Sequence, residues 1–311
     1  MDYPRTVQEF QAWFPDDAAC LAYLERLRWA NGFSCPGCAG TEYWAAKDGR
    51  RVCRACQRRT SVTAGTIFHR VRSPLTMWFM AAWLITSQKN GMSAQSLQRV
   101  LGLGSYETAW AWLHKFRRAM VREGRDRLSG LVEVDETFVD GVSVGSAGAA
   151  GRACVMVAVE KPGPGRTLGR IRLGLADRPG TVGLVAFAQN SVERGSTIHT
   201  DGARVMRRLG DLGYTHEYPR DPHAPEHEAV LPGVHLVGSL LKRWLTGTLH
   251  YGVAGHHLPY YLDEFTFRFN RRAADHRGLL FYRLLQQAVH TDPRPLAEIL
   301  DPDHNPYWNF S

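Results

Sequence analysis

Apolar side chains recur every three or four positions through residues 6–30 and again through residues 73–120. This period is typical of helices that bury one face. Each new apolar series follows a serine or an aspartate, and both are favoured helix N-caps. These residues are Asp16, Ser73, Ser93 and Ser105. We therefore expect an N-terminal helical segment over residues 1–32 and a three-helix domain over residues 73–125.

After residue 130 the pattern changes to short runs of β-branched and aromatic residues, which are typical of strands. The runs cover residues 131–139, 154–159, 170–175 and 196–200. A helical period over residues 179–191 separates the third run from the fourth, so the predicted order is three strands, a helix and a strand. A later apolar stripe at helical spacing, from Leu258 to Phe269, predicts a further core helix. Together these elements indicate an α/β domain with a mixed sheet over residues 130–290.

Three segments carry neither pattern. Residues 123–129 are charged and are expected to link the helical region to the α/β domain. The glycine-rich residues 141–151 predict a turn or loop, because no Lys-Ser/Thr pair follows that would make them a phosphate-binding loop. Residues 291–311 are rich in proline and aspartate, and they are expected to be either a mobile tail or a partner-docking arm.

Composition bears on the partners and the location of the chain. The 311 residues are 44% hydrophobic, which is enough for packed cores, and they carry a formal net charge of +8 at pH 7. Such a charge favours a polyanionic partner but does not specify a fold. No apolar run has the length needed to span a bilayer, and the N-terminus lacks the regions of a signal peptide. We expect a cytoplasmic, nucleoid-associated protein with no membrane partner.

Four of the six cysteines form two Cys-x2-Cys pairs separated by 14 residues. Each pair can turn two thiolates toward one point, and four thiolates satisfy tetrahedral Zn²⁺. A redox dithiol is the alternative reading, but it would not need a second copy at this separation. We predict one structural zinc in a ribbon over residues 33–62, since four protein ligands leave no open position for chemistry. The expected ligands are Cys35, Cys38, Cys53 and Cys56.

Basic residues surround the predicted ribbon, and few acids oppose them. Such a run is often only a solvated face, but on a small zinc module in a basic chain it favours contact with DNA phosphates. In the helical domain, two helices joined by a short glycine-containing turn predict a helix-turn-helix, with simple packing as the alternative. Its last helix is also basic. The candidate DNA-binding residues of the two regions are Arg54, Arg58, Arg59, Lys115, Arg117 and Arg118.

A carboxylate lies in the middle of the first strand of the α/β domain. Asp135, between Glu133 and Glu136, is costly to hold in a sheet unless a cation neutralises it, and a metal ion is the best candidate. The fourth strand ends on Asp201, and the glycine after it lets the chain turn away. Neighbouring strands would bring the two carboxylates close enough to hold divalent metals about 4 Å apart. A ribonuclease H-like nucleotidyl-transfer fold requires this arrangement.

A third ligand is expected on a later helix that faces the site. Residues 234–245 predict that helix, and on it His235 and Lys242 are two turns apart on one face. A metal ligand and a phosphate-contacting cation would then point the same way. The alternative is an ordinary core or surface histidine. Further candidates for phosphate contact are Arg243, Arg271 and Arg272.

Taken together, these motifs resemble those of bacterial insertion-sequence transposases of the DDE class, in the zinc-ribbon group whose catalytic region is called ISXO-two-like (the IS-fifteen-ninety-five family). The resemblance covers about residues 10–285 and rests on CPGC, CRAC, VEVDETFVDG, IHTDG, SLLKRWLTGT and YLDEFTFRFNRR. It implies that Asp135 is the first catalytic acid, Asp201 the second, and Lys242 the basic residue after the third ligand. The departure is at His235, where many relatives carry Glu and others in this group carry Asn or His.

The resemblance implies a transposase that exchanges one DNA phosphodiester for another. Two Mg²⁺ or Mn²⁺ ions would serve it: one, bound between Asp135 and Asp201, activates a water and then a DNA 3′-hydroxyl, and the other stabilises the leaving oxygen. No nucleotide cofactor is needed. The expected partners are double-stranded DNA, as terminal inverted repeats and target, and further copies of the chain, because a dimer or larger synaptic complex must bring two ends together.

Imidazole at position 235 is a poorer ligand than carboxylate for Mg²⁺ and a better one for Mn²⁺, so Mn²⁺ is expected to support more strand transfer. Two other functions stay open. One is a transposase-derived zinc-ribbon DNA-binding regulator without catalytic activity, and the other is a plain nuclease of the same fold. The presence of both Asp135 and Asp201 favours an enzyme, and the elaborate N-terminal region argues against a plain nuclease.

Overall fold

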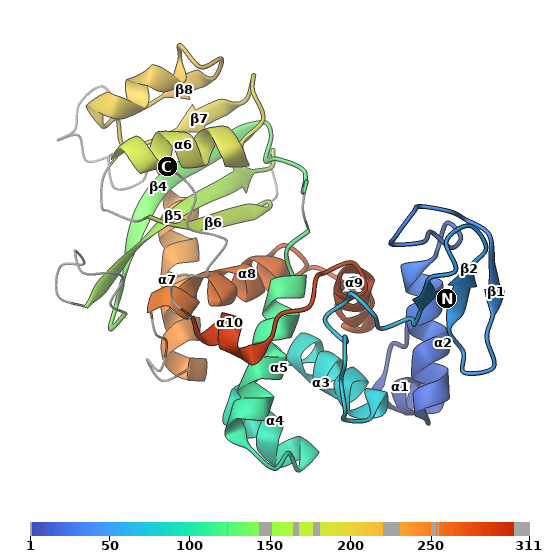
Figure 1. Ribbon diagram of the computed structural model, residues 1–311. Helices are drawn as coiled ribbons and strands as arrows, with labels where there is room; N and C mark the ends of the chain where they lie inside the picture. Colours follow the sequence, from blue (N-terminus) through green and yellow to red (C-terminus); the bar gives the residue numbers. More distant parts are fainter. Residues whose placement is uncertain are drawn as a thin grey trace. The chain divides into compact units, whose positions relative to one another are not determined.

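The computed structural model describes most of the chain, and its residues form two compact units (Figure 1). The described residues are 2–122, 124–142, 151–163, 168–176, 181–219, 231–249, 253 and 255–301. Unit 1 comprises residues 1–122 and 274–300, and unit 2 comprises residues 123–273 and 301–311. The chain thus returns to its first unit after residue 273, which the sequence pattern does not predict. Parts of the predicted loop at 141–151 and of the predicted tail at 291–311 lie outside the described residues.

Unit 1 is built largely from helices. They are α1 (Val7–Trp13), α2 (Asp17–Arg28), α3 (Leu75–Ser87), α4 (Ala94–Leu101), α5 (Tyr106–Ala119), α9 (Gly278–Ala288) and α10 (Leu296–Leu300). The side chains of Asp16, Ser93 and Ser105 cap α2, α4 and α5, as predicted. The predicted serine cap of α3 is wrong: Pro74 occupies the N-cap position, and no side-chain hydrogen bond is made there. The fixed φ of proline suits a helix start without that bond.

Phe281 on α9 explains why residues 274–300 belong to unit 1. Its ring centroid lies 5.5 Å from that of Phe10, 5.7 Å from that of Phe14 and 5.9 Å from that of Phe79. Aromatic rings at such separations gain packing energy beyond that of their burial. Phe281 is fully buried. Helix α9 therefore completes the aromatic core that α1, α2 and α3 begin.

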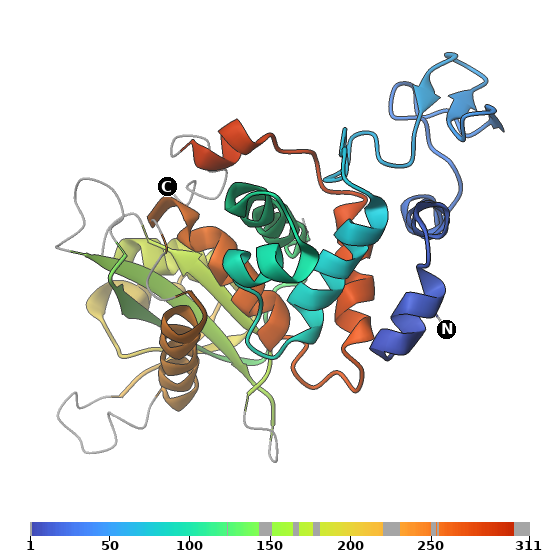
Figure 2. The ribbon, with the colours of Figure 1, turned by 90° about the horizontal axis from the view of Figure 1, so that it is seen from below.

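The ribbon region of unit 1 forms a small antiparallel sheet, drawn in lighter blue in Figure 2. Its strands are β1 (Tyr43–Ala45), β2 (Arg51–Cys53) and β3 (Arg59–Thr60). The Arg51 guanidinium lies 4.1 Å from the centroid of the Trp29 ring and 4.2 Å from that of Tyr43, and it pairs with Glu25. These cation–π contacts and the ion pair join β2 to α2 and to the residue that follows it.

Unit 2 contains a mixed five-stranded sheet in the order β6-β5-β4-β7-β8. The strands are β4 (Leu131–Asp140), β5 (Arg152–Lys161), β6 (Ile171–Leu175), β7 (Thr197–His199) and β8 (Thr215–Glu217). Strand β5 runs antiparallel to both β4 and β6, whereas β7 runs parallel to both β4 and β8. The four predicted strands are confirmed, and β8 is an addition to them.

Helices cover both faces of this sheet (Figures 1 and 2). They are α6 (Thr181–Ser191), η1 (Arg204–Leu209), α7 (Pro232–Leu249), η3 (Gly255–His257) and α8 (Leu258–Phe269). Side chains alternate along β4: Val132 joins the core under α6, and Val139 joins the core under α7 and α8. Glu133, Asp135 and Thr137 therefore face α7. The layered arrangement confirms the predicted ribonuclease H-like fold. None of the described helices in either unit is both long and apolar enough to cross a membrane.

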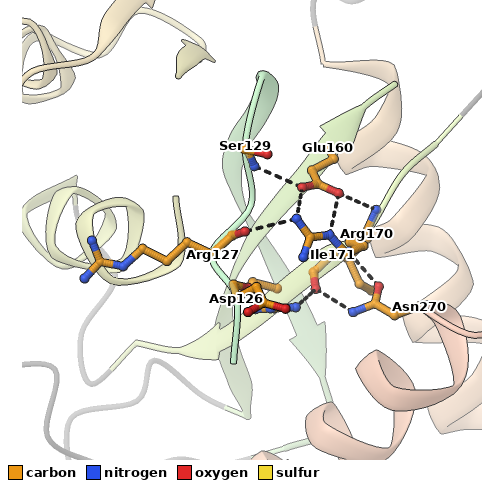
Figure 3. A network of polar contacts seen from close by, with 8 residues as sticks. Asp126, Arg127, Ser129, Glu160, Arg170, Ile171 and Asn270 are labelled. Carbon is orange, nitrogen blue, oxygen red and sulfur yellow. Dashed lines mark hydrogen bonds and ion pairs between the residues drawn. The ribbon is translucent and has the colours of Figure 1, made fainter. Parts of the chain in front are cut away.

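A polar network fixes the start of β4 and the outer edge of the sheet (Figure 3). Glu160 on β5 accepts hydrogen bonds from the backbone N–H of Ser129 and from Nε of Arg170, both at 2.9 Å. The side-chain amide of Asn270, which follows α8, accepts from the N–H of Ile171 at 2.7 Å and donates to its carbonyl at 3.1 Å. Asn270 thus pairs with the edge strand β6 as a neighbouring strand would, and it holds the end of α8 to the sheet.

Candidate active site and metal centre

Asp135 lies in β4, and Asp201 lies two residues beyond the end of the neighbouring strand β7. In the parallel pair of β4 and β7, Glu133 pairs with His199, and these residues are 66 positions apart in the chain. Asp135 and Asp201 are separated by the same 66 positions. Each lies two residues beyond the Glu133–His199 pair. The pairing ends there, and extended by one side-chain repeat of two residues the register would place Asp201 beside Asp135.

The charges of two predicted metal ligands, Asp201 and His235, act on the third, Asp135. Burial raises the pKa of Asp135 to about 6, and the negative charges of Asp201 and Glu136 add to the rise, whereas His235 opposes it. Interactions of this kind between exposed charges are largely screened beyond about 10 Å at 0.1 M salt. Asp201 is itself exposed, and its Oδ1 accepts a hydrogen bond from the N–H of Ala203 at 3.0 Å. Asp201 and His235 thus both lie near enough for their charges to act on the carboxyl group of Asp135.

Helix α7 runs along β4 at the level of Asp135. A methyl group added at Gly233 would lie 2.7 Å from Oε2 of Glu133, and one added at Gly238 would lie 3.1 Å from Oγ1 of Thr137. The absence of a side chain at these two positions permits the close approach. Because Asp135 is midway between Glu133 and Thr137 on the same face of β4, the helix passes beside it.

The predicted helix at 234–245 is confirmed as part of α7, which begins two residues earlier and ends four residues later. His235, Lys242 and Arg243 are all exposed on it. The spacing of His235 and Lys242 places them on one face of the helix, two turns apart. A cationic side chain is therefore available on the helix face that carries the candidate third ligand.

Two carboxylates and an imidazole are a donor set that suits a divalent cation. Within the described part of the chain, the four ribbon cysteines form the one group in which three or more such ligand atoms lie within 4.8 Å of one another. The donor atoms of Asp135, Asp201 and His235 are therefore more widely spaced. The repulsion that contributes to the raised pKa of Asp135 is of the kind that a bound cation relieves. By charge and chemistry, these residues fit a divalent metal.

The four ribbon cysteines form the predicted zinc centre. The Sγ atoms of Cys35 and Cys56 lie 3.5 Å apart, and those of Cys38 and Cys53 lie 3.6 Å apart. The N–H of Gly37 donates to Sγ of Cys35, and this hydrogen bond is the main cause of the lowering of the Cys35 pKa to about 6. The thiolate is the form that binds zinc. A converging group of four cysteines is typical of structural zinc.

The ribbon presents an aromatic and basic face to solvent. Arg54, Arg58 and Arg59 are exposed, as a contact with DNA requires. Trp44, which the sequence patterns do not single out, is 43% exposed. Trp44 and Arg59 both pair with Val52 across the small sheet, so their side chains share one face. DNA contact by this face stays a prediction.

The basic residues of α5 are less accessible. Lys115 and Arg118 are half-buried, and Arg117 is 1% exposed. Burial also lowers the pKa of Lys115. DNA contact by these three residues stays a prediction, and Arg117 is the weakest candidate because burial keeps it from a phosphate. The first turn of α5 is more open, since Tyr106 is 54% exposed.

Arg271 and Arg272 have structural contacts at the end of α8. Arg271 lies over the Phe267 ring, 4.0 Å from its centroid, and donates to the Phe267 carbonyl at 3.1 Å. Arg272 lies over the Phe269 ring at 4.2 Å and donates to the carbonyls of Phe269 and Gly169. These contacts stabilise the helix end, where cationic side chains also complement the helix dipole. Phosphate contact by either arginine stays a prediction.

Comparison with known proteins matches two segments of the chain to transposase domains. Residues 15–59 match the family described as "Transposase zinc-ribbon domain", and residues 127–270 match the "ISXO2-like transposase domain". The first match contains all four ribbon cysteines, and the second contains Asp135, Asp201 and His235. A relative from Halobacterium salinarum, described as "Uncharacterized protein in transposable element ISH50", is 29% identical over 290 residues, and the match covers 82% of this chain and 91% of the relative. Residues 15–59 are therefore identified as a transposase zinc-ribbon domain, and residues 127–270 as an ISXO2-like transposase domain.

Proposed function

We propose that this transposase binds the ends of its insertion sequence and catalyses metal-dependent DNA strand cleavage and strand transfer. The observation that carries the proposal is the parallel pairing of β4 with β7, whose register, extended by two residues, would bring Asp201 beside Asp135. The charge of His235, on helix α7, also acts on Asp135 and supports a role as the third ligand. Two aligned carboxylates with a third ligand on a facing helix are what a phosphodiester exchange of this class requires.

Asp135, Asp201 and His235 would hold two divalent ions, Mg²⁺ or Mn²⁺. When bound, such ions activate the attacking oxygen and stabilise the leaving oxygen of the phosphodiester. Asp135 offers an ionised carboxylate only as the pH rises through about 6. Lys242 and Arg243 are exposed on α7, and Lys242 shares a helix face with His235. Their role is to hold a DNA phosphate beside the metal ligands through charge-assisted hydrogen bonds.

Recognition of the element ends is assigned to unit 1. The exposed arginines of the ribbon, Arg54, Arg58 and Arg59, would contact phosphates. The turn between α4 and α5, with the open first turn of α5, would enter a groove as a helix-turn-helix does. Because transposition joins two ends of one element, the active species is a dimer or a larger complex on double-stranded DNA.

The test is incubation of the full-length protein with labelled DNA fragments that carry both ends of its element, in the presence of Mn²⁺. Products in which an end is joined to target DNA support the proposal. Products that are only cut indicate a nuclease. Binding without cutting or joining overturns the proposal and indicates a regulator. Each outcome is read from the same denaturing and native gels.

A DNA-binding regulator without catalytic activity is a second candidate. One observation favours it: the third ligand, His235, adds no negative charge to the two aspartates, so the site holds a hard cation such as Mg²⁺ less firmly than three carboxylates do. Both candidates bind the element ends. Only the transposase yields joined products that disappear when Asp135 is replaced by Asn.

A further inference from the structure

Glu133 is a buried carboxylate of β4 that the proposed chemistry does not use. Its side chain is 2% exposed, and both of its oxygens are engaged. Oε1 lies 3.0 Å from Nζ of Lys161, at the end of β5, and Oε2 accepts a hydrogen bond from the N–H of Val234 at 3.0 Å. A buried carboxylate is stable only when it is paired and hydrogen-bonded in this way. With its oxygens occupied, Glu133 is a poor candidate for a metal ligand.

The hydrogen bond to Val234 is made at the start of a helix. Val234 lies in the first turn of α7, which begins at Pro232. The first N–H groups of a helix have no partner within the helix, and the helix dipole favours a negative charge beside them. A side chain at the start of the same helix often accepts hydrogen bonds from these N–H groups. In α7 the acceptor is Glu133 of β4, so the hydrogen bond joins the helix to the strand.

The contacts of α7 with β4 bracket Asp135. On one side, Glu133 bonds to Val234, and the lack of a side chain at Gly233 lets the helix approach. On the other side, Gly238 lies against Thr137. His235 follows Val234 directly, so the hydrogen bond at Val234 restrains the backbone that carries the imidazole. The charged partner of Glu133, Lys161, comes from β5, so neither partner of Glu133 is a predicted metal ligand.

We propose that Glu133, held by Lys161, is a positioning residue that fixes the first turn of α7 and thereby the place of His235 relative to Asp135. The inference rests on the proposed function of His235 as a metal ligand. Glu133 itself would touch neither metal nor DNA. Its effect on the reaction is transmitted through the backbone of α7.

Glu133→Gln is the informative substitution because it preserves shape. Lys161 and the N–H of Val234 are both donors, and an amide has only one acceptor oxygen, so Gln must present its NH2 group to one of them. Deuterium exchange in the full-length protein is expected to be about tenfold faster in the first turn of α7. Exchange in α6 should be unchanged, which controls for global unfolding. Lys161→Gln, which leaves Glu133 without its cation, should loosen the same turn.

Unchanged exchange in the first turn of α7 in both variants overturns the inference whatever the metal site does. The link to the site is tested by Mn²⁺ titration of Glu133→Gln, of His235→Ala and of the double variant. Each single change is expected to weaken Mn²⁺ binding about tenfold, and the double variant should bind no worse than His235→Ala.

In one contrary outcome, Glu133→Gln weakens Mn²⁺ binding by the same factor in the wild type and in His235→Ala. That result would show that Glu133 does not act through His235, and it would overturn the positioning role. If His235→Ala leaves Mn²⁺ binding intact, His235 is not a ligand. In that case the proposed role of His235 fails, and so does the proposed effect of Glu133 on the metal site. Faster exchange in the first turn of α7 in Glu133→Gln would then show only that Glu133 anchors the helix. The exchange measurement thus separates a failed anchor from a failed metal site.

Discussion

His235 acts electrostatically on Asp135 from a different layer of the fold, and it lowers the pKa that burial raises. Asp135 belongs to the central strand of the sheet, and His235 belongs to the helix that packs over that strand. The raised pKa of Asp135 means that the metal-free fold holds an ionised carboxylate at an energetic cost. That cost is expected where a cation normally binds.

The first prediction concerns stability against pH without added divalent metal. The pKa of Asp135 is about 6 in the folded state, against an ordinary value of 3.8. The folded state thus binds a proton more readily than the unfolded chain, so stability falls as the pH rises from about 4 to 6. At pH 7.5, Asp135→Asn should be more stable than the wild type by on the order of 1–2 kcal/mol, after allowance for solvent screening.

Urea unfolding at a series of pH values measures this difference. The gain from Asp135→Asn should shrink as the pH falls and vanish near pH 4. Asp140→Asn is the matched control, because Asp140 lies on the same strand but is exposed and paired with Arg152. A gain that does not change with pH would contradict the assignment of the effect to ionised Asp135.

The second prediction concerns the choice of metal. Imidazole favours Mn²⁺ over Mg²⁺ more than a carboxylate does, so the wild type should join ends faster with Mn²⁺. His235→Glu should narrow the ratio of the two rates by about tenfold, the scale on which metal sites respond to such changes. Rates of end joining in each metal give the ratio. Equal wild-type rates in the two metals would speak against His235 as a ligand.

The third prediction concerns the zinc centre. Elemental analysis should find one zinc per chain, and Cys53→Ser should lose it, because structural zinc needs all four ligands. The affinity of Cys53→Ser for the element ends should also fall, since the fold of the ribbon sheet depends on the bound zinc. Cys20→Ala is the control: Cys20 is buried in α2, away from the four ribbon cysteines, and its loss should leave the zinc content unchanged. Full zinc content in Cys53→Ser would refute the assignment.

The fourth prediction concerns the ribbon surface. Each phosphate contact contributes about 0.9 to the slope of the logarithm of the binding constant against the logarithm of salt concentration. Arg59→Gln should lower that slope by about this amount, whereas Arg283→Gln, an exposed change on α9, should not alter it. Fluorescence anisotropy with an end fragment at several salt concentrations gives the slopes. An unaltered slope for Arg59→Gln would remove it from the interface.

Much of the fold is predictable because local pattern and tertiary role agree. The run around Val132 and Val134 is β-branched because both residues face the core under α6. Strand β8 escapes prediction, since Thr215–Glu217 is a short polar edge strand without a buried apolar face. Helix α9 shows a second limit. The spacing of its apolar residues does not indicate which unit the helix packs against. Contacts such as that between Phe281 and Phe10 assign it to unit 1.

The candidate site, like the fold, is only partly predictable from the sequence. Asp135 and Asp201 are identifiable because each carboxylate interrupts or ends an apolar run, which is costly without a cation. The alternation along the strand does not by itself distinguish Asp135 from Glu133, since both are acidic and two residues apart on one face. What separates them is the partner. Glu133 meets Lys161 and the start of α7, whereas the charges acting on Asp135 come mainly from Asp201, Glu136 and His235.

The measurement closest to the central claim is end joining by Asp135→Asn and Asp201→Asn, each compared with Asp140→Asn and the wild type. Loss of either carboxylate removes several kcal/mol of metal-dependent stabilisation from the transition state, so joining should fall by at least about a thousandfold. Binding to the element ends should persist, and Asp140→Asn should remain active. Joining at the wild-type rate by either Asn variant would contradict the assignment of Asp135 and Asp201 as the catalytic acids.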